Sequence, residues 1–237
     1  MHILVLQHAR VEHPGIFRNF LTRDGHSWDA VELDEGEGLP GLDGYDALWV
    51  MGGPMDVWQE DQHPWLKAEK AIIREAVVDR EMPYLGLCLG HQLLAEALGG
   101  TVGPSKTPEI GVMDVNVIDD GALFEGMPRR IACLQWHSAE VTEVPTGARV
   151  LASSPACAVQ AMAWKTHAYA LQFHMEIEAD TVANWADIPE YAGALDKAMG
   201  AGAVARLEAE CAARMGTFNA MAEQLYGNWI KATSRPG

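Results

Sequence analysis

Cys88 stands in a segment whose residue types could support nucleophilic chemistry. The run Pro83–Gln92, PYLGLCLGHQ, predicts a short buried strand, a sharp turn and then a helix, with Gly86 and Gly90 two residues on either side of the cysteine. This is the sulfur counterpart of the G-x-S-x-G nucleophile elbow. Glycine suits both positions because so tight a reversal brings backbones into contact. The free N–H groups at the start of the following helix, 89–98, favour an anion, so the segment predicts a reactive thiolate.

A base for this thiol is expected far along the chain. The apolar run 169–173 reads as a strand and leads into His174, with Glu176 two residues further on. In an extended chain both side chains turn to the same side, so the carboxylate can orient the imidazole as a base toward Cys88. Glu178 is a competing acid, but the run 177–183 looks like the start of a helix. Cysteine, histidine and acid together form the general pattern of a covalent acyl-transfer site.

Acyl transfer also needs backbone N–H donors for the developing oxyanion. The apolar strand 47–51 runs into a Gly52-Gly53-Pro54 turn. We expect the N–H of Gly53 to be one donor and the N–H of Leu89, just after the cysteine, to be the second. A Gly-Gly-Pro sequence taken alone is more often an ordinary turn.

Taken together, the segments 52–54, 86–92 and 172–176 resemble the class I glutamine amidotransferases with a Cys-His-Glu triad, in that family's order and at similar separations. The resemblance runs from Met1 to Glu176. Residues 55–58, 63–66 and 109–111 are similar to the stand-alone branch related to the amidotransferase half of GMP synthetase. One departure is Met175, where the family usually has proline, and a looser His-Glu pair is expected from it.

The resemblance also implies residues that bind the substrate. Gln92 on the elbow helix and the segment that contains His137 and Ser138 are expected beside bound glutamine, the segment through its backbone groups. No metal and no cofactor is implied.

The resemblance implies cleavage of the glutamine side-chain amide through a γ-glutamyl thioester, with ammonia passed to an acceptor on a partner synthetase subunit. Two alternatives stay open. A γ-glutamyl peptidase would use the same chemistry on γ-glutamyl peptides without a partner. A non-catalytic regulatory subunit would keep only the fold.

Composition narrows the classes further. The chain has 237 residues, with 33 acidic and 17 basic side chains and a formal net charge of -16. This charge disfavours nucleic acid and anionic membrane surfaces as partners. The four cysteines are widely spread with no C-x-x-C pair, which favours a reducing, cytoplasmic setting without a disulfide framework. Residues 36–41 match G-x-G-x-x-G, but the turn residues that follow indicate a surface loop rather than a dinucleotide site.

Hydrophobic periodicity predicts the elements that position these residues. Strands are expected over 3–7, 28–33, 47–51 and 83–87, and helices over 15–24, 64–80 and 89–98. This alternation predicts an α/β fold, an open and mostly parallel sheet with helices on both faces in three layers, flavodoxin-like. Short strands and turns are expected over 112–173. The chain is interpreted as a single domain, 1–237, with a helical extension from about residue 178 that includes one long helix over 201–231.

Overall fold

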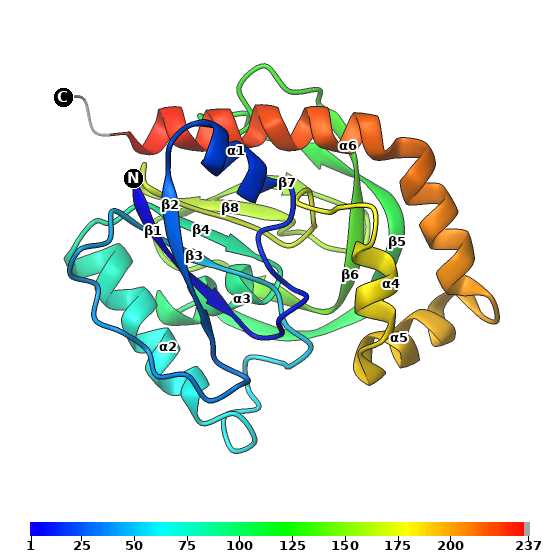
Figure 1. Cartoon of the computed structure of the whole chain (residues 1–237), viewed down its shortest axis with the longest axis horizontal. Helices are drawn as coiled ribbons and strands as arrows, with labels where there is room; N and C mark the ends of the chain where they lie inside the picture. Colours follow the sequence, from blue (N-terminus) through cyan, green and yellow to red (C-terminus); the bar gives the residue numbers. More distant parts are fainter. Residues whose placement is uncertain (235–237) are drawn as a thin grey trace.

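A nine-stranded sheet forms the centre of the molecule in the computed structural model, which describes residues 1–234 (Figure 1). Its order is β2-β1-β3-β4-β9-β8-β7-β5-β6. The neighbours from β2 to β9 are parallel, and the remaining pairs are antiparallel. The strands are β1 (His2–Gln7), β2 (Ser27–Glu32), β3 (Ala47–Val50), β4 (Tyr84–Leu87), β5 (Thr101–Val117), β6 (Arg130–Glu143), β7 (Ala148–Ser153), β8 (Ala161–Trp164) and β9 (Ala168–Leu171).

Helices cover both faces of this sheet (Figure 1). They are α1 (Phe17–Arg23), α2 (Trp65–Arg74), the π-helical turn η1 (Glu75–Asp79), α3 (Leu89–Ala97), α4 (Thr181–Ala186), α5 (Pro189–Met199) and α6 (Ala203–Thr233). The predicted α/β class and three-layer arrangement are therefore confirmed. Parallel pairing is limited to one half of the sheet.

Alternation along β1 shows how the two faces are built. Ile3 and Val5 join one hydrophobic cluster, which includes residues of α1 and α6. Leu4 and Leu6 join a second cluster with residues of α2 and α3. Successive strand side chains point to opposite faces, so a fully apolar strand suits a sheet covered on both sides. A third cluster joins α4, α5 and the first half of α6 to β5 and β6.

Two predicted segments differ from the structure. The helix expected over 64–80 is α2 followed by η1, so regular α-helix ends at Arg74. The short strands expected over 112–173 include the long strand β6, which pairs with the 17-residue strand β5. Proline usually ends a strand, and β5 contains Pro104 and Pro108. A register shift between Pro104 and Glu109 accommodates them, so the strand continues.

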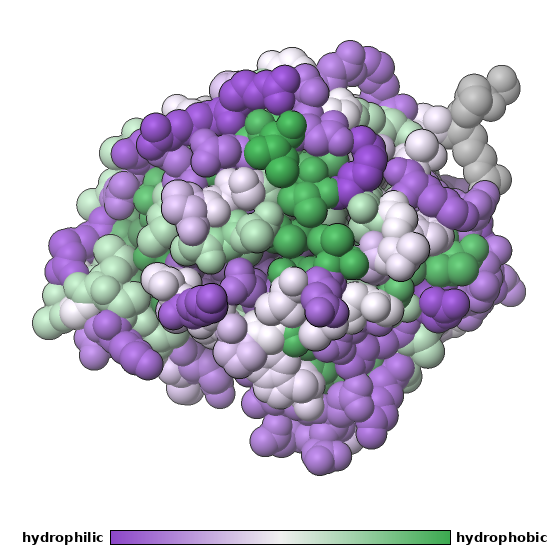
Figure 2. Space-filling view, turned by 180° about the vertical axis from the view of Figure 1, so that it is seen from behind, coloured by the Kyte–Doolittle hydropathy of each residue, from purple (hydrophilic) through white to green (hydrophobic). Residues whose placement is uncertain are grey.

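The rear surface is mostly hydrophilic, with apolar residues gathered near its centre (Figure 2). Among residues 1–234, no helix has both the length and the hydropathy of a membrane span. The G-x-G-x-x-G match at 36–41 lies in the connection between β2 and β3, outside any helix or strand.

Candidate active site

Cys88 lies at the turn between β4 and α3, at the carboxyl end of the parallel strands. It has a φ of 51°, in the range that L-residues rarely adopt, and its residue is only 4% exposed. A Cβ added at Gly90 would lie 2.1 Å from the carbonyl oxygen of Val50, and one added at Gly86 would lie 2.6 Å from that of Gly90. The turn thus requires glycine at both positions, and it has the geometry of a nucleophile elbow.

His174 follows β9 and meets Glu176 directly. Nδ1 of His174 lies 2.7 Å from Oε1 of Glu176, and both residues are buried. Burial alone would lower the pKa of His174, but the Glu176 carboxylate and a hydrogen bond with Cys88 raise it well above its ordinary value. The imidazole therefore lies between the acid and the thiol, and the structure brings together the three residues that the motifs single out.

Met175 contributes to this pair through its backbone. Its N–H donates to Oε2 of Glu176 at 2.9 Å, a bond that proline could not make. The expected looseness of the pair is therefore offset by an added hydrogen bond. Glu178, the competing acid, points elsewhere: its Oε2 lies 2.5 Å from Nη2 of Arg18 on α1.

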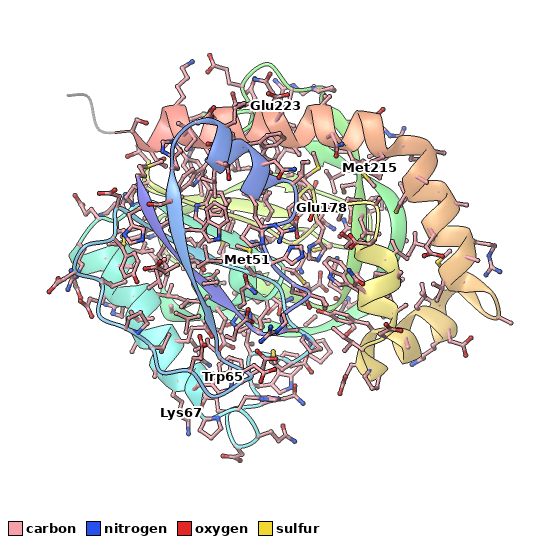
Figure 3. The ribbon with its side chains drawn as sticks, viewed as in Figure 1. Met51, Trp65, Lys67, Glu178, Met215 and Glu223 are labelled. Carbon is pink, nitrogen blue, oxygen red and sulfur yellow. The ribbon has the colours of Figure 1, made fainter. Side chains whose placement is uncertain are left out.

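The Gly52-Gly53-Pro54 turn lies beside the elbow. The N–H of Gly90 donates to the carbonyl oxygen of Met51 at 3.1 Å, which ties the start of α3 to the end of β3. Met51 lies near the middle of the molecule in Figure 3. Gly53 and Leu89 line the same cavity as Cys88. Leu89 is the first residue of α3, so its N–H has no acceptor within the helix.

The three expected substrate residues also line this cavity. Nε2 of Gln92 donates to the carbonyl oxygen of Ala139 at 3.2 Å, which joins α3 to the segment that follows His137 and Ser138. Ser138 is exposed to solvent. The imidazole of His137 is buried, with Nδ1 3.0 Å from the Ala139 carbonyl oxygen, and both residues lie within β6.

Several residues at the site were not predicted. Nε2 of Gln172 lies 3.5 Å from Sγ of Cys88, and its Oε1 accepts from Gln92 at 3.0 Å. Gln172 lies within the predicted strand and motif, and alternation past β9 could have placed it near the cysteine.

Glu12 was also missed. It is buried, accepts a hydrogen bond from the hydroxyl of Tyr191 on α5, and interacts electrostatically with His174. Burial raises its pKa to about 7. Glu12 follows β1, and only the rule that ligands bind at the carboxyl ends of strands could have singled it out.

Helices α4 and α5 complete the surroundings of the histidine. The ring of Trp185 packs edge-on against His174, with centroids 4.5 Å apart, and its Nε1 donates to the carbonyl oxygen of Val11. Tyr191 contacts Trp136 through its ring and lines the cavity beside Cys88. The helical segment after residue 178 thus supplies side chains to the site.

Two hollows meet at this place. A cavity of about 50 Å³ lies against Cys88. A second hollow of about 350 Å³ shares Trp136, Ser138 and Tyr191 with it and extends toward Gln59 and Glu190. The narrow cavity can admit a side chain, and the larger hollow can hold what is attached to it.

A nearby cluster has metal-ligand residue types. Glu109, His137 and Cys157 place one candidate ligand atom each within 4.8 Å of one another. The Glu109 carboxylate accepts hydrogen bonds from Ser154 Oγ and Gln160 Nε2, both at 2.7 Å, and lies 3.4 Å from His137 Nε2. These bonds satisfy the carboxylate without a cation and favour a structural role.

Fold and site together define an α/β protein with a nucleophile elbow and a cysteine–histidine–glutamate cluster, and comparison with known proteins agrees. The family model described as "Glutamine amidotransferase class-I" matches residues 21–182, so the chain belongs to that family. It is 38% identical over 135 residues to a glutamine-hydrolyzing GMP synthase subunit of Saccharolobus solfataricus, covering 56% of this chain and 69% of that one. The corresponding protein of Sulfolobus acidocaldarius is 33% identical over 151 residues, covering 63% and 77%.

Solved structures extend the likeness to the whole chain. A glutamine amidotransferase from Thermotoga maritima has a TM-score of 0.87 at 27% identity and covers 98% of both chains. One from Methylobacillus flagellatus has a TM-score of 0.87 at 30% identity, covering 99% of this chain and 96% of that one. Helices α5 and α6 lie beyond the family-model match but within these structural matches.

Proposed function

We propose that this chain hydrolyses the side-chain amide of glutamine and supplies the ammonia to an acceptor on a synthetase subunit. The observation that carries the proposal is the position of His174 between two partners. Its Nδ1 lies 2.7 Å from Oε1 of Glu176, and the ring also interacts with Cys88 at the elbow. The relatives named as glutamine-hydrolyzing GMP synthase subunits support a partner of the synthetase type.

The proposed reaction has two stages, formation of a γ-glutamyl thioester and its hydrolysis. The Cys88 thiolate attacks the amide carbon, and the oxyanion accepts hydrogen bonds from the N–H groups of Gly53 and Leu89. His174, held by Glu176, gives a proton to the leaving nitrogen, so the C–N bond breaks and ammonia departs. Water, deprotonated by the same imidazole, then attacks the γ-glutamyl thioester and releases glutamate and the thiolate.

The substrate would enter with its amide in the narrow cavity. Gln92, His137 and Ser138 line that cavity and would bound the glutamyl portion. Gln172, which reaches Sγ of Cys88, would donate to the thiolate.

The test uses the nucleophile. We expect Cys88→Ala to abolish glutamine hydrolysis with an unchanged circular dichroism spectrum. A glutamine-like chloroketone should label Cys88 in the unmodified chain and spare Cys133, Cys157 and Cys211. Cys133→Ala is the matched control, because Cys133 is also buried but lies within β6. Labelling at another cysteine while Cys88 stays free would refute the mechanism.

A second candidate is a γ-glutamyl peptidase, which the adjoining hollow of about 350 Å³ favours. That space could hold a leaving group larger than ammonia. To distinguish the two candidates, kcat/KM of the isolated chain is measured for glutamine and for several γ-glutamyl peptides. A preference for peptides would favour the peptidase. A regulatory protein without activity would hydrolyse neither class.

A further inference from the structure

A second buried histidine–carboxylate pair lies behind the Gly52-Gly53 turn. His8 directly follows β1, and Glu69 lies on α2; both are almost fully buried. Nε2 of His8 lies 2.8 Å from Oε1 of Glu69, and Nδ1 lies 2.8 Å from the carbonyl oxygen of Gly52. The ring of Trp65 stacks on the His8 ring with centroids 5.3 Å apart. The reaction steps above do not use this pair.

Hydrogen bonding determines the charge of this histidine. Both of its ring nitrogens face oxygen atoms, a backbone carbonyl and a carboxylate, and these oxygens accept rather than donate. An imidazole that donates from both nitrogens is protonated and cationic. Burial lowers the pKa of His8, but the Glu69 carboxylate, the bond to Gly52 and the charge of Glu12 together raise it. Among the described residues Oε2 of Glu69 has no hydrogen-bond partner, so the bond from His8 to Oε1 is what compensates this buried carboxylate.

The bond between His8 and the Gly52 carbonyl also sets the direction of the Gly53 N–H, the candidate oxyanion donor. The carbonyl of Gly52 and the N–H of Gly53 belong to one peptide group, and no cis peptide occurs among the described residues. In a trans peptide these two groups point in opposite directions. A carbonyl held by His8 therefore turns the N–H of Gly53 away from His8. Within residues 1–234 that N–H has no backbone acceptor.

Packing fixes the same peptide in position. A Cβ added at Gly53 would lie within 2.8 Å of His8, Leu89 and Met55 atoms, so the backbone is enclosed on these sides. The N–H of Met51 donates to the carbonyl oxygen of Leu6 at 3.0 Å, which anchors the preceding residue to β1. The cation on one side of the peptide also polarises it and strengthens its N–H as a donor.

We propose that His8 and Glu69 are positioning residues that hold the Gly52-Gly53 peptide with its N–H directed at the oxyanion formed on the substrate of Cys88. This rests on the proposed function for its catalytic consequence. Neither residue touches the substrate. The pair acts through one peptide group, so its loss should slow acyl transfer and spare the reactivity of the thiol.

The main experiment separates these two effects. We expect His8→Phe, which keeps a ring against Trp65, to lower kcat for glutamine by about 10²–10³, the usual effect of one lost oxyanion donor, with KM changed less than about threefold. Alkylation of Cys88 by iodoacetamide forms no oxyanion, so its rate should stay within about threefold. His8→Asn can place an amide N–H near the position of Nδ1 and should recover part of kcat.

A matched control and a charge variant complete the set. His167 also places Nε2 near a backbone carbonyl, that of Val77 at 2.9 Å, but it precedes β9 at the opposite end of the strands; His167→Phe should leave kcat unchanged. Glu69→Gln removes the charge, keeps the shape of the side chain and should lower kcat by about tenfold. This variant tests the proposal even if His8→Phe fails to fold. Unchanged kcat in Glu69→Gln, or parallel losses of hydrolysis and alkylation in the folded variants, would overturn the proposal.

A direct measurement keeps this inference separate from the proposed function. Nitrogen NMR of ¹⁵N-histidine-labelled protein should show both ring nitrogens of His8 protonated at pH 7, and neutral His8 in Glu69→Gln. A neutral His8 in the unmodified chain would overturn the proposal whatever the activity. A chain that hydrolyses neither glutamine nor γ-glutamyl peptides, yet shows the cationic His8, would refute the proposed function and leave the bonding of the pair intact.

Discussion

Glu176 and Glu178 are two acids of one type, two residues apart, with different partners. Glu176 meets His174 at 2.7 Å, and Glu178 pairs with Arg18. We expect Glu176→Gln to lower kcat by a factor of about 10² or more, because a neutral amide no longer stabilises the imidazolium. Glu178→Gln should change kcat less than about threefold. Initial rates on glutamine check this; equal losses would mean that the Arg18 pair also supports the site.

Glu12 gives the stability of the chain a pH dependence. Its pKa is about 7 in the folded state against about 4.5 when unfolded, with His174, His8, Glu176 and Tyr191 as the groups facing it. Folding then favours protonated Glu12. The free energy of unfolding therefore holds the full stabilisation from Glu12 below pH 4.5. It falls as the pH rises through about 7, by roughly 3 kcal/mol at most.

We therefore expect Glu12→Gln to raise the free energy of unfolding relative to the unmodified chain more at pH 8 than at pH 5. Urea unfolding at both pH values measures this difference. Glu223→Gln, which removes an exposed carboxylate on α6, is the control (Figure 3). The same change at both pH values for Glu12→Gln would show that its burial does not govern its charge.

Single residues show what sequence reasoning could reach. Cys88, His174 and Glu176 could be singled out because each stands in a motif with a fixed local spacing. His8, Glu12 and Glu69 stand in no such motif, and only the fold brings them to the site. Glu69 did carry a signal: with Leu66 and Ile73 it occupies the buried stripe of α2, where a carboxylate needs a partner.

At the scale of elements, the contact between α3 and β3 determines how the elbow is built. A Cβ added at Gly90 would lie 2.1 Å from the Val50 carbonyl oxygen, and backbone cannot move aside cheaply. We expect Gly90→Ala to destabilise the fold by about 1–3 kcal/mol or more and to abolish hydrolysis. Gly216→Ala in α6 meets no atom within 4 Å and should stabilise the chain by about 0.5–1 kcal/mol. Melting temperatures of the two variants check this. An unchanged melting temperature for Gly90→Ala would contradict this account of the elbow.

Elements in the parallel half were predictable because strand and helix periodicities alternate there. The predicted long helix over 201–231 is α6, and Leu207, Cys211, Phe218 and Leu225 are buried along it. The elements of the antiparallel half were not predictable, since β5 contains prolines and glycines that usually end a strand. Its length depends on pairing with β6 and on a register shift, which are non-local and leave no periodic pattern in the sequence.

At the scale of the whole molecule, a partner would meet a site that is already assembled. The Gly52 carbonyl is bonded within the chain, and Trp185 and Tyr191 come from its own helices. We expect a synthetase subunit of the GMP synthase type to change kcat for glutamine by less than about tenfold. Stimulation by 10²–10³ would instead mean that docking creates an oxyanion donor. Initial rates at saturating glutamine, with and without the subunit, decide this.

Helix α6 also has a thermodynamic consequence. Its 31 residues span about 46 Å, at about 1.5 Å per residue. Leu207 and Phe218 belong to the cluster under α4 and α5, whereas Tyr226 and Trp229 belong to the cluster against β1 and β3. One continuous helix thus joins the two clusters on top of the link that β5 and β6 provide, since those strands supply buried residues to both. We expect a single calorimetric transition with equal van't Hoff and calorimetric enthalpies. After Gly216→Pro interrupts the helix the transition should move to lower temperature and stay single, because β5 and β6 still join the two clusters.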